Sequence, residues 1–206
     1  MAAADAAARL IGDPAVAAAW EKPSALERYS VGGVAGHLAA QVFFLAKVMA
    51  DSGPPPQEEQ VTLPQYYSGS NWVDAGIDDG PHVRIRAQGE SNASDGPQAL
   101  TDRVTAAADE LRKSLPSAPD RLVRLPTWGA YSLSFDDFVI TRLMELLVHS
   151  DDLAVSVGVP TPSVPVTASD TVVDLLAQLA ARRHGPTAVI RALSRTERAP
   201  ASIAAF

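Results

Sequence analysis

The sequence predicts a mainly α-helical bundle with long crossover connections and at most minor strand content. Apolar residues recur at helical spacing in several stretches, and these stretches carry capping residues and proline or glycine stops. The strand-like stretches are too few to build a sheet-based core. With 206 residues, 47% of them hydrophobic and 20% charged, the chain can form one well-cored domain. We expect that domain to cover residues 1–206, with 185–206 as a short C-terminal extension.

The first two helices are expected over residues 3–20 and from Ser30 to about Met49. The first is rich in alanine and contains Pro14, which predicts a helix in two parts. Ser30 is a candidate N-cap for the second helix. Its apolar positions follow helical spacing: Val31, Val34, Leu38, Val42, Leu45 and Met49. The run 53–56, Gly-Pro-Pro-Pro, ends it.

Residues 52–93 lack sustained periodicity and predict a long irregular connection. It holds Tyr66, Tyr67 and Trp72, and Val83 to Ala87 could form a short extended piece. A connection of this length in a compact domain often covers or lines a functional site.

Four more helices are expected in the second half of the chain. The first spans about 98–115 and ends before Pro116. The next runs from Phe135 to about Val157, opened by a capping box at Ser134 and stopped by Gly158. The last two cover 169–184, capped by Ser169, and 187–195.

Charge and composition argue against several partners. Seventeen Lys and Arg against 24 Asp and Glu give a net charge of -7, which offers no basic field for nucleic acid or anionic lipid. No apolar run approaches the roughly 20 residues that span a bilayer. The alanine-rich start contains Asp5 and Asp13 and lacks a basic leader, unlike a signal peptide. We therefore expect a cytoplasmic protein with no nucleic-acid and no membrane partner.

The chain contains no cysteine, so it can supply neither a thiolate ligand nor a sulfur nucleophile. If sulfur chemistry takes place, a small thiol must bring the sulfur. Metal ligands must come from His, Asp and Glu, and there are only four histidines. His184 follows two arginines at a helix end, where a positive charge suits the helix dipole, and we leave it out of the site.

The helix expected over 135–157 carries a polar stripe although it is apolar nearly all round. Phe138, Arg142, Glu145, His149 and Asp152 fall within one sector of this helix, and the last four of them form the polar stripe. Such a helix is expected to be buried, and buried charges persist only when they are paired or bound to metal. Glu145 and His149 are one turn apart, so both can bind one ion; the alternative is a hydrogen bond along the helix.

His37 is the candidate for a third ligand. It stands beside Gly32, Gly33 and Gly36, which lower helix propensity by about 1 kcal/mol each but let another element approach closely. Its helical sector is mainly apolar, so we expect it to point into the bundle, as a ligand or as a hydrogen-bonded core histidine. Together, His37, Glu145 and His149 predict a site for one divalent ion, zinc in the first instance. Three protein ligands leave a coordination position open, which is typical of a reactive site.

Other residues are expected to support this site. Asp152 could orient a ligand imidazole and Arg142 could hold an anionic group of the substrate, the alternative being an ion pair across a helix turn. His82 and Arg84 lie in the long connection, where solvent exposure is the alternative. The candidate substrate-binding residues are Gln41, Arg84, His82 and Trp72.

Two segments carry a family resemblance: residues 29–39, YSVGGVAGHLA, and residues 145–154, ELLVHSDDLA. The pair resembles the N-terminal domain of the mycothiol-dependent maleylpyruvate isomerase family, within the DinB-like metal-binding bundles, over roughly residues 5–185. The resemblance implies a four-helix core, zinc held by His37, Glu145 and His149, and use of the thiol mycothiol. The isomerase has a further α/β domain after the bundle, whereas about twenty residues follow His184 here. We therefore do not expect maleylpyruvate isomerisation itself.

The resulting expectation is a zinc-dependent, mycothiol-using transferase or isomerase that acts on a small electrophile. In mechanism, the ion would lower the pKa of the thiol and present its thiolate to an electrophilic carbon. Two alternatives stay open: a metal-dependent hydrolase of the same fold, and a non-catalytic, metal-binding regulatory bundle. A monomer and a homodimer are both compatible with the sequence.

Overall fold

The computed structural model describes residues 1–51, 53, 56–124 and 131–206, and it confirms the mainly helical fold. The α-helices are α1 (Ala2–Ile11), α2 (Pro14–Ala18), α3 (Val31–Ala50), α4 (Leu63–Gly69), α5 (Gly80–Ala93), α6 (Pro97–Ser114), α7 (Phe135–Val157), α8 (Val166–His184) and α9 (Pro186–Ser194). Two 3-10 turns, η1 (Leu115–Ser117) and η2 (Thr196–Arg198), follow α6 and α9. The strands are β1 (Glu59–Gln60), β2 (Leu122–Val123) and β3 (Tyr131–Ser134).

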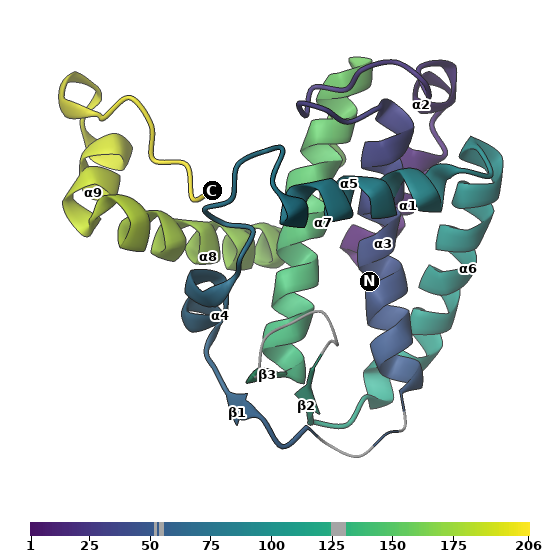
Figure 1. Cartoon of the computed structure of the whole chain (residues 1–206), viewed down its shortest axis with the longest axis horizontal. Helices are drawn as coiled ribbons and strands as arrows, with labels where there is room; N and C mark the ends of the chain where they lie inside the picture. Colours follow the sequence, from purple (N-terminus) through teal and green to yellow (C-terminus); the bar gives the residue numbers. More distant parts are fainter. Residues whose placement is uncertain (52, 54–55, 125–130) are drawn as a thin grey trace.

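Helix α3 is at the centre of the bundle. It packs against α1, α5, α6 and α7, and α1 also packs against α6 and α7. In Figure 1, α3, α6 and α7 run roughly side by side, while α5 crosses them near one end. The buried core comes mainly from these helices, so the two helices that carry the candidate ligands are both core elements.

The ends of α3 and α7 follow the predicted capping chemistry. The Ser30 hydroxyl accepts a hydrogen bond from the Gly33 amide at 2.8 Å, and the Ser134 hydroxyl accepts one from the Asp137 amide at 3.1 Å. Helix α7 ends at Gly158, whose φ of 71° lies in the left-handed region that glycine adopts most easily. The two serine caps fix the residue at which each helix begins, and so which of its side chains face the bundle.

Helix α3 is 20 residues long and contains an 18-residue stretch with a mean hydropathy of 1.4, so by length and composition it could cross a membrane. The expectation that no stretch approaches that length is wrong in this respect. However, 72% of this stretch is buried inside the fold, as expected of a core helix.

The connection 52–93 is more ordered than the sequence predicts. It contains α4 and α5, and the extended piece expected at Val83 to Ala87 is wrong, because these residues lie within α5. Helix α5 packs closely on α3, where a Cβ atom added to Gly36 would lie 2.0 Å from the Gly89 carbonyl oxygen. The glycines of α3 thus allow the close approach that the sequence predicts: the neighbour of Gly33 and Gly36 is α5, and that of Gly32 is Trp20.

The small sheet ties the α4 segment to the start of α7. Strand β3 lies between β1, which pairs with it in parallel, and β2, which pairs with it antiparallel. Strand β3 runs directly into α7, whereas β1 leads into α4 through a capping box between Thr62 and Gln65. In this arrangement the ring of Tyr66 in α4 lies 6.0 Å from that of Tyr131 in β3, the strand that leads into α7.

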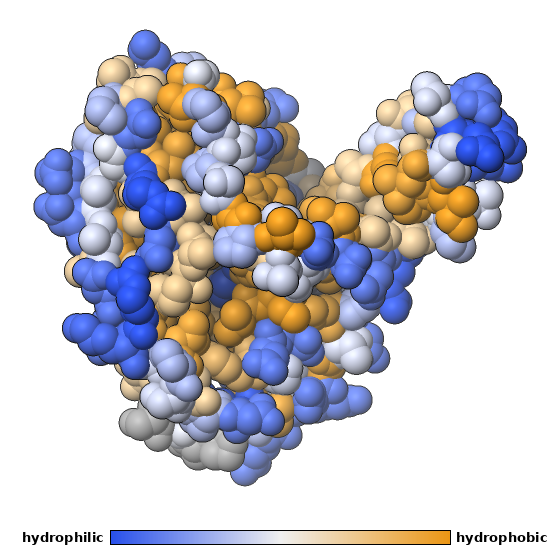
Figure 2. Space-filling model, turned by 180° about the vertical axis from the view of Figure 1, so that it is seen from behind, coloured by the Kyte–Doolittle hydropathy of each residue, from blue (hydrophilic) through white to orange (hydrophobic). Residues whose placement is uncertain are grey.

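Helices α8 and α9 extend from the bundle as an arm (Figure 1). Helix α8 begins at Val166, so Ser169 is not its cap. Figure 2 shows hydrophobic surface on this arm. The large apolar side chains that are exposed on the arm are Val166, Val173, Ile190 and Leu193.

Candidate metal centre

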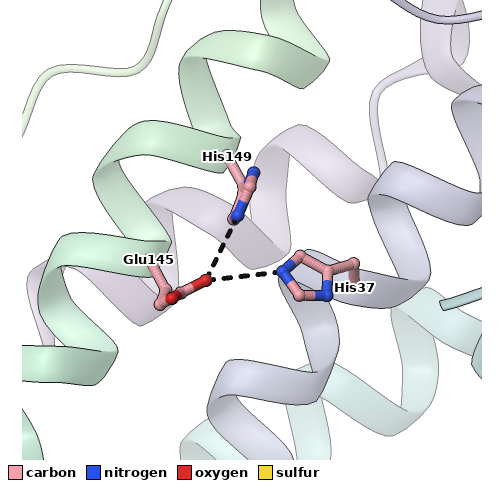
Figure 3. A group of neighbouring side chains, drawn as sticks. All are labelled: His37, Glu145 and His149. Carbon is pink, nitrogen blue, oxygen red and sulfur yellow. Dashed lines mark hydrogen bonds and ion pairs between the residues drawn. The ribbon is translucent and has the colours of Figure 1, made fainter. Parts of the chain in front are cut away.

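Two helices bring His37, Glu145 and His149 to one point inside the bundle. Figure 3 shows His37 of α3 opposite Glu145 and His149 of α7, with the three side chains directed toward one another. The Glu145 Oε2 atom is 3.4 Å from His37 Nε2 and 3.2 Å from His149 Nε2. The three side chains are only 13%, 15% and 18% exposed, in chain order. This juxtaposition joins positions more than a hundred residues apart.

The spacing of these atoms is compatible with metal ligation as well as with a hydrogen-bonded cluster. A charge-assisted N–H···O bond is about 2.7–2.9 Å long. The bond from His149 Nδ1 to Asp152 Oδ2, at 2.8 Å, has that length, whereas the two distances to Glu145 Oε2 are longer. A tetrahedral zinc ion bonded at about 2.0–2.1 Å would hold its ligand atoms about 3.3 Å apart. The three side chains therefore fit a metal ion, and their ligand atoms all lie within 4.8 Å of one another.

Asp152 holds the imidazole ring of His149 through a hydrogen bond at Nδ1. The Asp152 carboxylate accepts a hydrogen bond from His149 Nδ1, and this contact orients the ring so that Nε2 faces Glu145 and the centre of the site. A carboxylate behind a histidine is the usual way in which a ligand imidazole is oriented in metalloproteins. The hydrogen bond between Asp152 and His149 is the contact that the predicted role of Asp152 requires, and the role itself stays a prediction.

A second network supports His37 from the other side. The Gln41 side chain donates to the His37 carbonyl oxygen at 2.9 Å and accepts a hydrogen bond from the buried guanidinium of Arg142. Arg142 also donates to Thr141 Oγ1 at 3.1 Å. Its guanidinium lies 5.9 Å from the ring centre of Phe44 and 5.6 Å from that of Phe138. Arg142 is thus held in place by partners on both α3 and α7.

The ionisation of the three candidate ligands is strongly shifted. Burial lowers the pKa of His37, and the neighbouring His149 lowers it further, so His37 is neutral near pH 7. Burial raises the pKa of Glu145, but hydrogen bonds from His149 and His37 outweigh it and hold the pKa well below its ordinary value. Burial lowers the pKa of His149, yet its hydrogen bonds with Asp152 and Glu145 outweigh this and raise the pKa to about 9. In the metal-free protein at neutral pH, His149 is therefore the protonated histidine of the site.

The other predicted substrate-binding residues lie in varied environments. Gln41 is buried and joins His37 to Arg142. His82 Nε2 is 2.9 Å from the Trp72 carbonyl oxygen, and Arg84 is exposed and folds back over Gly80 at the start of α5. Within the described residues, we find no hydrogen bond or ion pair that links His82, Arg84 or Trp72 directly to the three candidate ligands. Their roles stay predictions.

The structure adds two tyrosines that the sequence does not single out as site residues. The Tyr29 ring lies 6.3 Å from that of His37, and Tyr67 of α4 is buried within electrostatic range of Glu145 and Arg142. Tyr29 stands in the segment just before α3, and Tyr67 follows the Thr62–Gln65 capping box, which is a readable signal for a helix in that region.

Two surface cavities, of about 340 and 400 Å³, are lined by residues other than the three candidate ligands. The first lies between α1, α7 and the segment 161–164, and the second between α4, α7 and α8. Neither cavity therefore defines the entrance to the buried cluster.

The fold and the site together define a helical bundle whose two central helices present a His-Glu-His group that could hold a metal ion. The model of the family described as "Mycothiol maleylpyruvate isomerase N-terminal domain" matches residues 1–154, and the chain belongs to this family. The family description links the chain to a mycothiol-related, isomerase-like domain and confirms the resemblance seen in the sequence. Comparison with curated proteins gave no match, and comparison with solved structures gave none either.

Proposed function

We propose that this protein is a zinc-dependent enzyme that uses mycothiol to transfer or isomerise a small electrophilic substrate. In this proposal, His37, Glu145 and His149 hold the ion, and Arg142 and Asp152 support them. The observation that carries the proposal is the spacing of the two histidine nitrogens around Glu145 Oε2, at 3.4 and 3.2 Å. Family membership supports the choice of mycothiol.

When bound, a divalent ion would lower the pKa of a coordinated thiol and so stabilise its thiolate near neutral pH. The chain supplies no thiol, since it contains no cysteine, and this fits a site that takes its sulfur from a small molecule. Three protein ligands leave room in the coordination sphere for that sulfur.

The protein's own residues would hold this site in one geometry. Asp152 keeps the Nδ1 proton of His149, so that Nε2 presents its lone pair to the ion. Gln41 holds the backbone of His37 and the side chain of Arg142 together. Arg142 provides a fixed positive charge beside Glu145, where it can attract an anionic group of the substrate.

The test begins with metal content and continues with turnover. Purified protein is analysed for bound metal, loaded with zinc, and mixed with a chromogenic electrophile such as 1-chloro-2,4-dinitrobenzene with and without mycothiol. The proposal expects about one zinc per chain and consumption of the electrophile above the uncatalysed rate only when mycothiol is present. Turnover without any thiol would instead favour the hydrolase alternative.

Histidine variants provide the matched control. His37→Ala and His149→Ala should each lose stoichiometric zinc. His184→Ala should keep it, because His184 is exposed at the end of α8 and contacts the Ala204 carbonyl. Full zinc stoichiometry in both His37→Ala and His149→Ala would overturn the proposed ligand set.

If the ion were only structural, zinc removal should unfold the chain and no ligand exchange should occur at the metal. Circular dichroism of the metal-free protein separates this regulatory-bundle alternative from the enzyme. The proposal expects the helical signal to persist without zinc, because a large apolar core is buried around α3 and α7.

A further inference from the structure

One buried polar atom near the candidate metal centre has no partner. The hydroxyl of Tyr67 is buried and forms no hydrogen bond within the described residues. Tyr67 is only 2% exposed, so solvent does not reach its side chain freely. Buried polar groups are nearly always hydrogen-bonded, and an unpaired buried hydroxyl destabilises the fold. Such a group calls for a functional explanation.

The rest of Tyr67 is firmly held. Its ring packs edge-on against those of Tyr66, at 4.9 Å between ring centres, and Trp72, at 6.1 Å. The ring of Phe206 lies 5.7 Å away and also contacts Trp72. These aromatic contacts fix the ring, so the hydroxyl cannot turn away to find another partner.

The charges that act on the Tyr67 hydroxyl belong to the candidate metal centre. Burial raises the pKa of Tyr67 well above its ordinary value; among the charged groups, Glu145 raises it further and Arg142 lowers it. The phenol therefore keeps its proton at physiological pH, and it lies within electrostatic range of a proposed metal ligand. It can donate a hydrogen bond there but cannot act as an anion.

We propose that the Tyr67 hydroxyl donates a hydrogen bond to the exogenous ligand that binds the ion beside Glu145. This inference rests on the proposed function and deepens it, because it names a positioning residue for the incoming ligand. The acceptor is an electron-rich atom on that ligand: the sulfur of the thiol or an oxygen of the electrophile. The aromatic cluster of Tyr66, Trp72 and Phe206 holds the donor in place.

The neighbouring Tyr66 offers a matched control on the same helix. Tyr66 is also buried, at 5% exposure, but its hydroxyl has a side-chain hydrogen bond with Ser70. Replacing a partnered hydroxyl removes a bond, whereas replacing an unpartnered one removes only an unpaired group. The two tyrosine-to-phenylalanine changes should therefore move the melting temperature of the metal-free protein in different directions.

The experiment compares wild type, Tyr67→Phe and Tyr66→Phe. In the metal-free proteins, we expect Tyr67→Phe to melt at or above the wild-type temperature and Tyr66→Phe to melt below it. With Co²⁺ in place of zinc, the visible spectrum then reports ligands at the ion during titration with azide and, separately, with mycothiol. Both variants should bind Co²⁺ as wild type does.

A lost hydrogen bond to a charged acceptor weakens binding roughly 10- to 100-fold. We expect a loss of this size in Tyr67→Phe for azide, and for mycothiol if the sulfur is the acceptor. If the electrophile oxygen is the acceptor, mycothiol binding stays unchanged and kcat/KM for the electrophile falls instead. In each case Tyr66→Phe should stay within about twofold of wild type.

The inference is overturned if Tyr67→Phe binds azide and mycothiol and turns over the electrophile as wild type does. It is also overturned if Tyr67→Phe lowers the melting temperature as Tyr66→Phe does, since the hydroxyl would then have a structural partner. A wild-type protein that binds azide but no mycothiol would refute the proposed function alone, because the azide titration still tests Tyr67. Failure of wild type to bind either probe at the ion would refute both.

Discussion

Zinc binding to this protein should be strongly pH-dependent because one ligand must lose a proton. Burial lowers the pKa of His149, but hydrogen bonds with Asp152 and Glu145 outweigh it and raise the pKa from 6.5 to about 9. This rise corresponds to about 3 kcal/mol in favour of the charged imidazole, at about 1.4 kcal/mol per pH unit. Zinc needs the neutral imidazole, so below pH 9 the ion competes with the proton.

The other two ligands contribute little to this competition near neutral pH. The pKa of His37 is lowered by burial, and that of Glu145 is held well below its ordinary value by the two histidines. One proton per zinc should therefore be released at pH 7–8, and the affinity for zinc should rise about tenfold per pH unit up to about pH 9. Calorimetry in buffers of different ionisation enthalpy counts the protons, and a competing chromophoric chelator measures the affinity.

The metal-free protein should show the opposite trend in stability. A folded-state pKa of about 9, above the ordinary 6.5, gives a stabilisation that is fully present below pH 6.5 and lost as the pH rises through 9. Urea unfolding of the metal-free protein at pH 6.5 and pH 9.5 tests this.

Asp152→Asn is the control for the zinc-binding prediction. It weakens the hold on the His149 proton, so fewer protons should be released on zinc binding at pH 8. Zinc affinity that is constant from pH 6.5 to 9 would refute this reasoning.

Three further perturbations have defined outcomes. Gly36→Ala should destabilise the fold by about 2 kcal/mol or more in thermal unfolding, because the new Cβ would meet a backbone oxygen at 2.0 Å. This overpacking outweighs the gain in helix propensity of about 1 kcal/mol. The control variant Gly69→Ala, whose Cβ would meet nothing within 4 Å, should be neutral or slightly stabilising. Arg142→Met should cost about 1–3 kcal/mol in urea unfolding, since Gln41 is left without its buried donor, and should reduce turnover without changing zinc stoichiometry. Glu145→Gln should lose zinc in elemental analysis. The stabilisation from the low pKa of Glu145 is present above pH 4.5 and lost as the pH falls, so this variant should also show a smaller loss of stability on acidification.

The parts of the fold with strong apolar periodicity and clear caps were predictable from the sequence. Helix α7 spans Phe135–Val157, as predicted, and α3 spans Val31–Ala50, one residue beyond the prediction. In both helices the capping serine forms the expected bond. Periodicity and capping are local signals, so a single sequence is enough to read them.

Helix α5 was missed because it packs through small residues. The residues that it buries fully are Gly89 and Ala93, so it has no apolar stripe for periodicity to detect. Its contact with α3 depends on Gly36 and Gly89 having no side chains. The signal that remains is Asp79 followed by Pro81 in the first turn, which marks a helix start only weakly.

The candidate ligands and their common site were predictable from the sequence, but the distances between them were not. The polar stripe of α7 identifies Glu145 and His149, and the glycine-rich segment identifies His37. Nothing local shows that His37 faces Glu145 Oε2 at 3.4 Å, because that distance depends on how α3 packs on α7. The expected inward direction of all three side chains placed them at one predicted site, the family resemblance implied the same set, and the structure brings them together.

Several features that oppose stability belong to the candidate metal centre or are influenced by its charges. Glycines in α3 lower helix propensity, Glu145 and Arg142 are charges taken out of water, and Tyr67 holds an unpaired hydroxyl. The glycines and the charges belong to the two helices that carry His37 and His149, and Glu145 and Arg142 act on the Tyr67 hydroxyl. Proteins tolerate such local conflicts mainly where function requires them. Variants that relieve one of them, such as Tyr67→Phe, should therefore gain or keep stability while they lose ligand binding, which a purely structural cluster would not show.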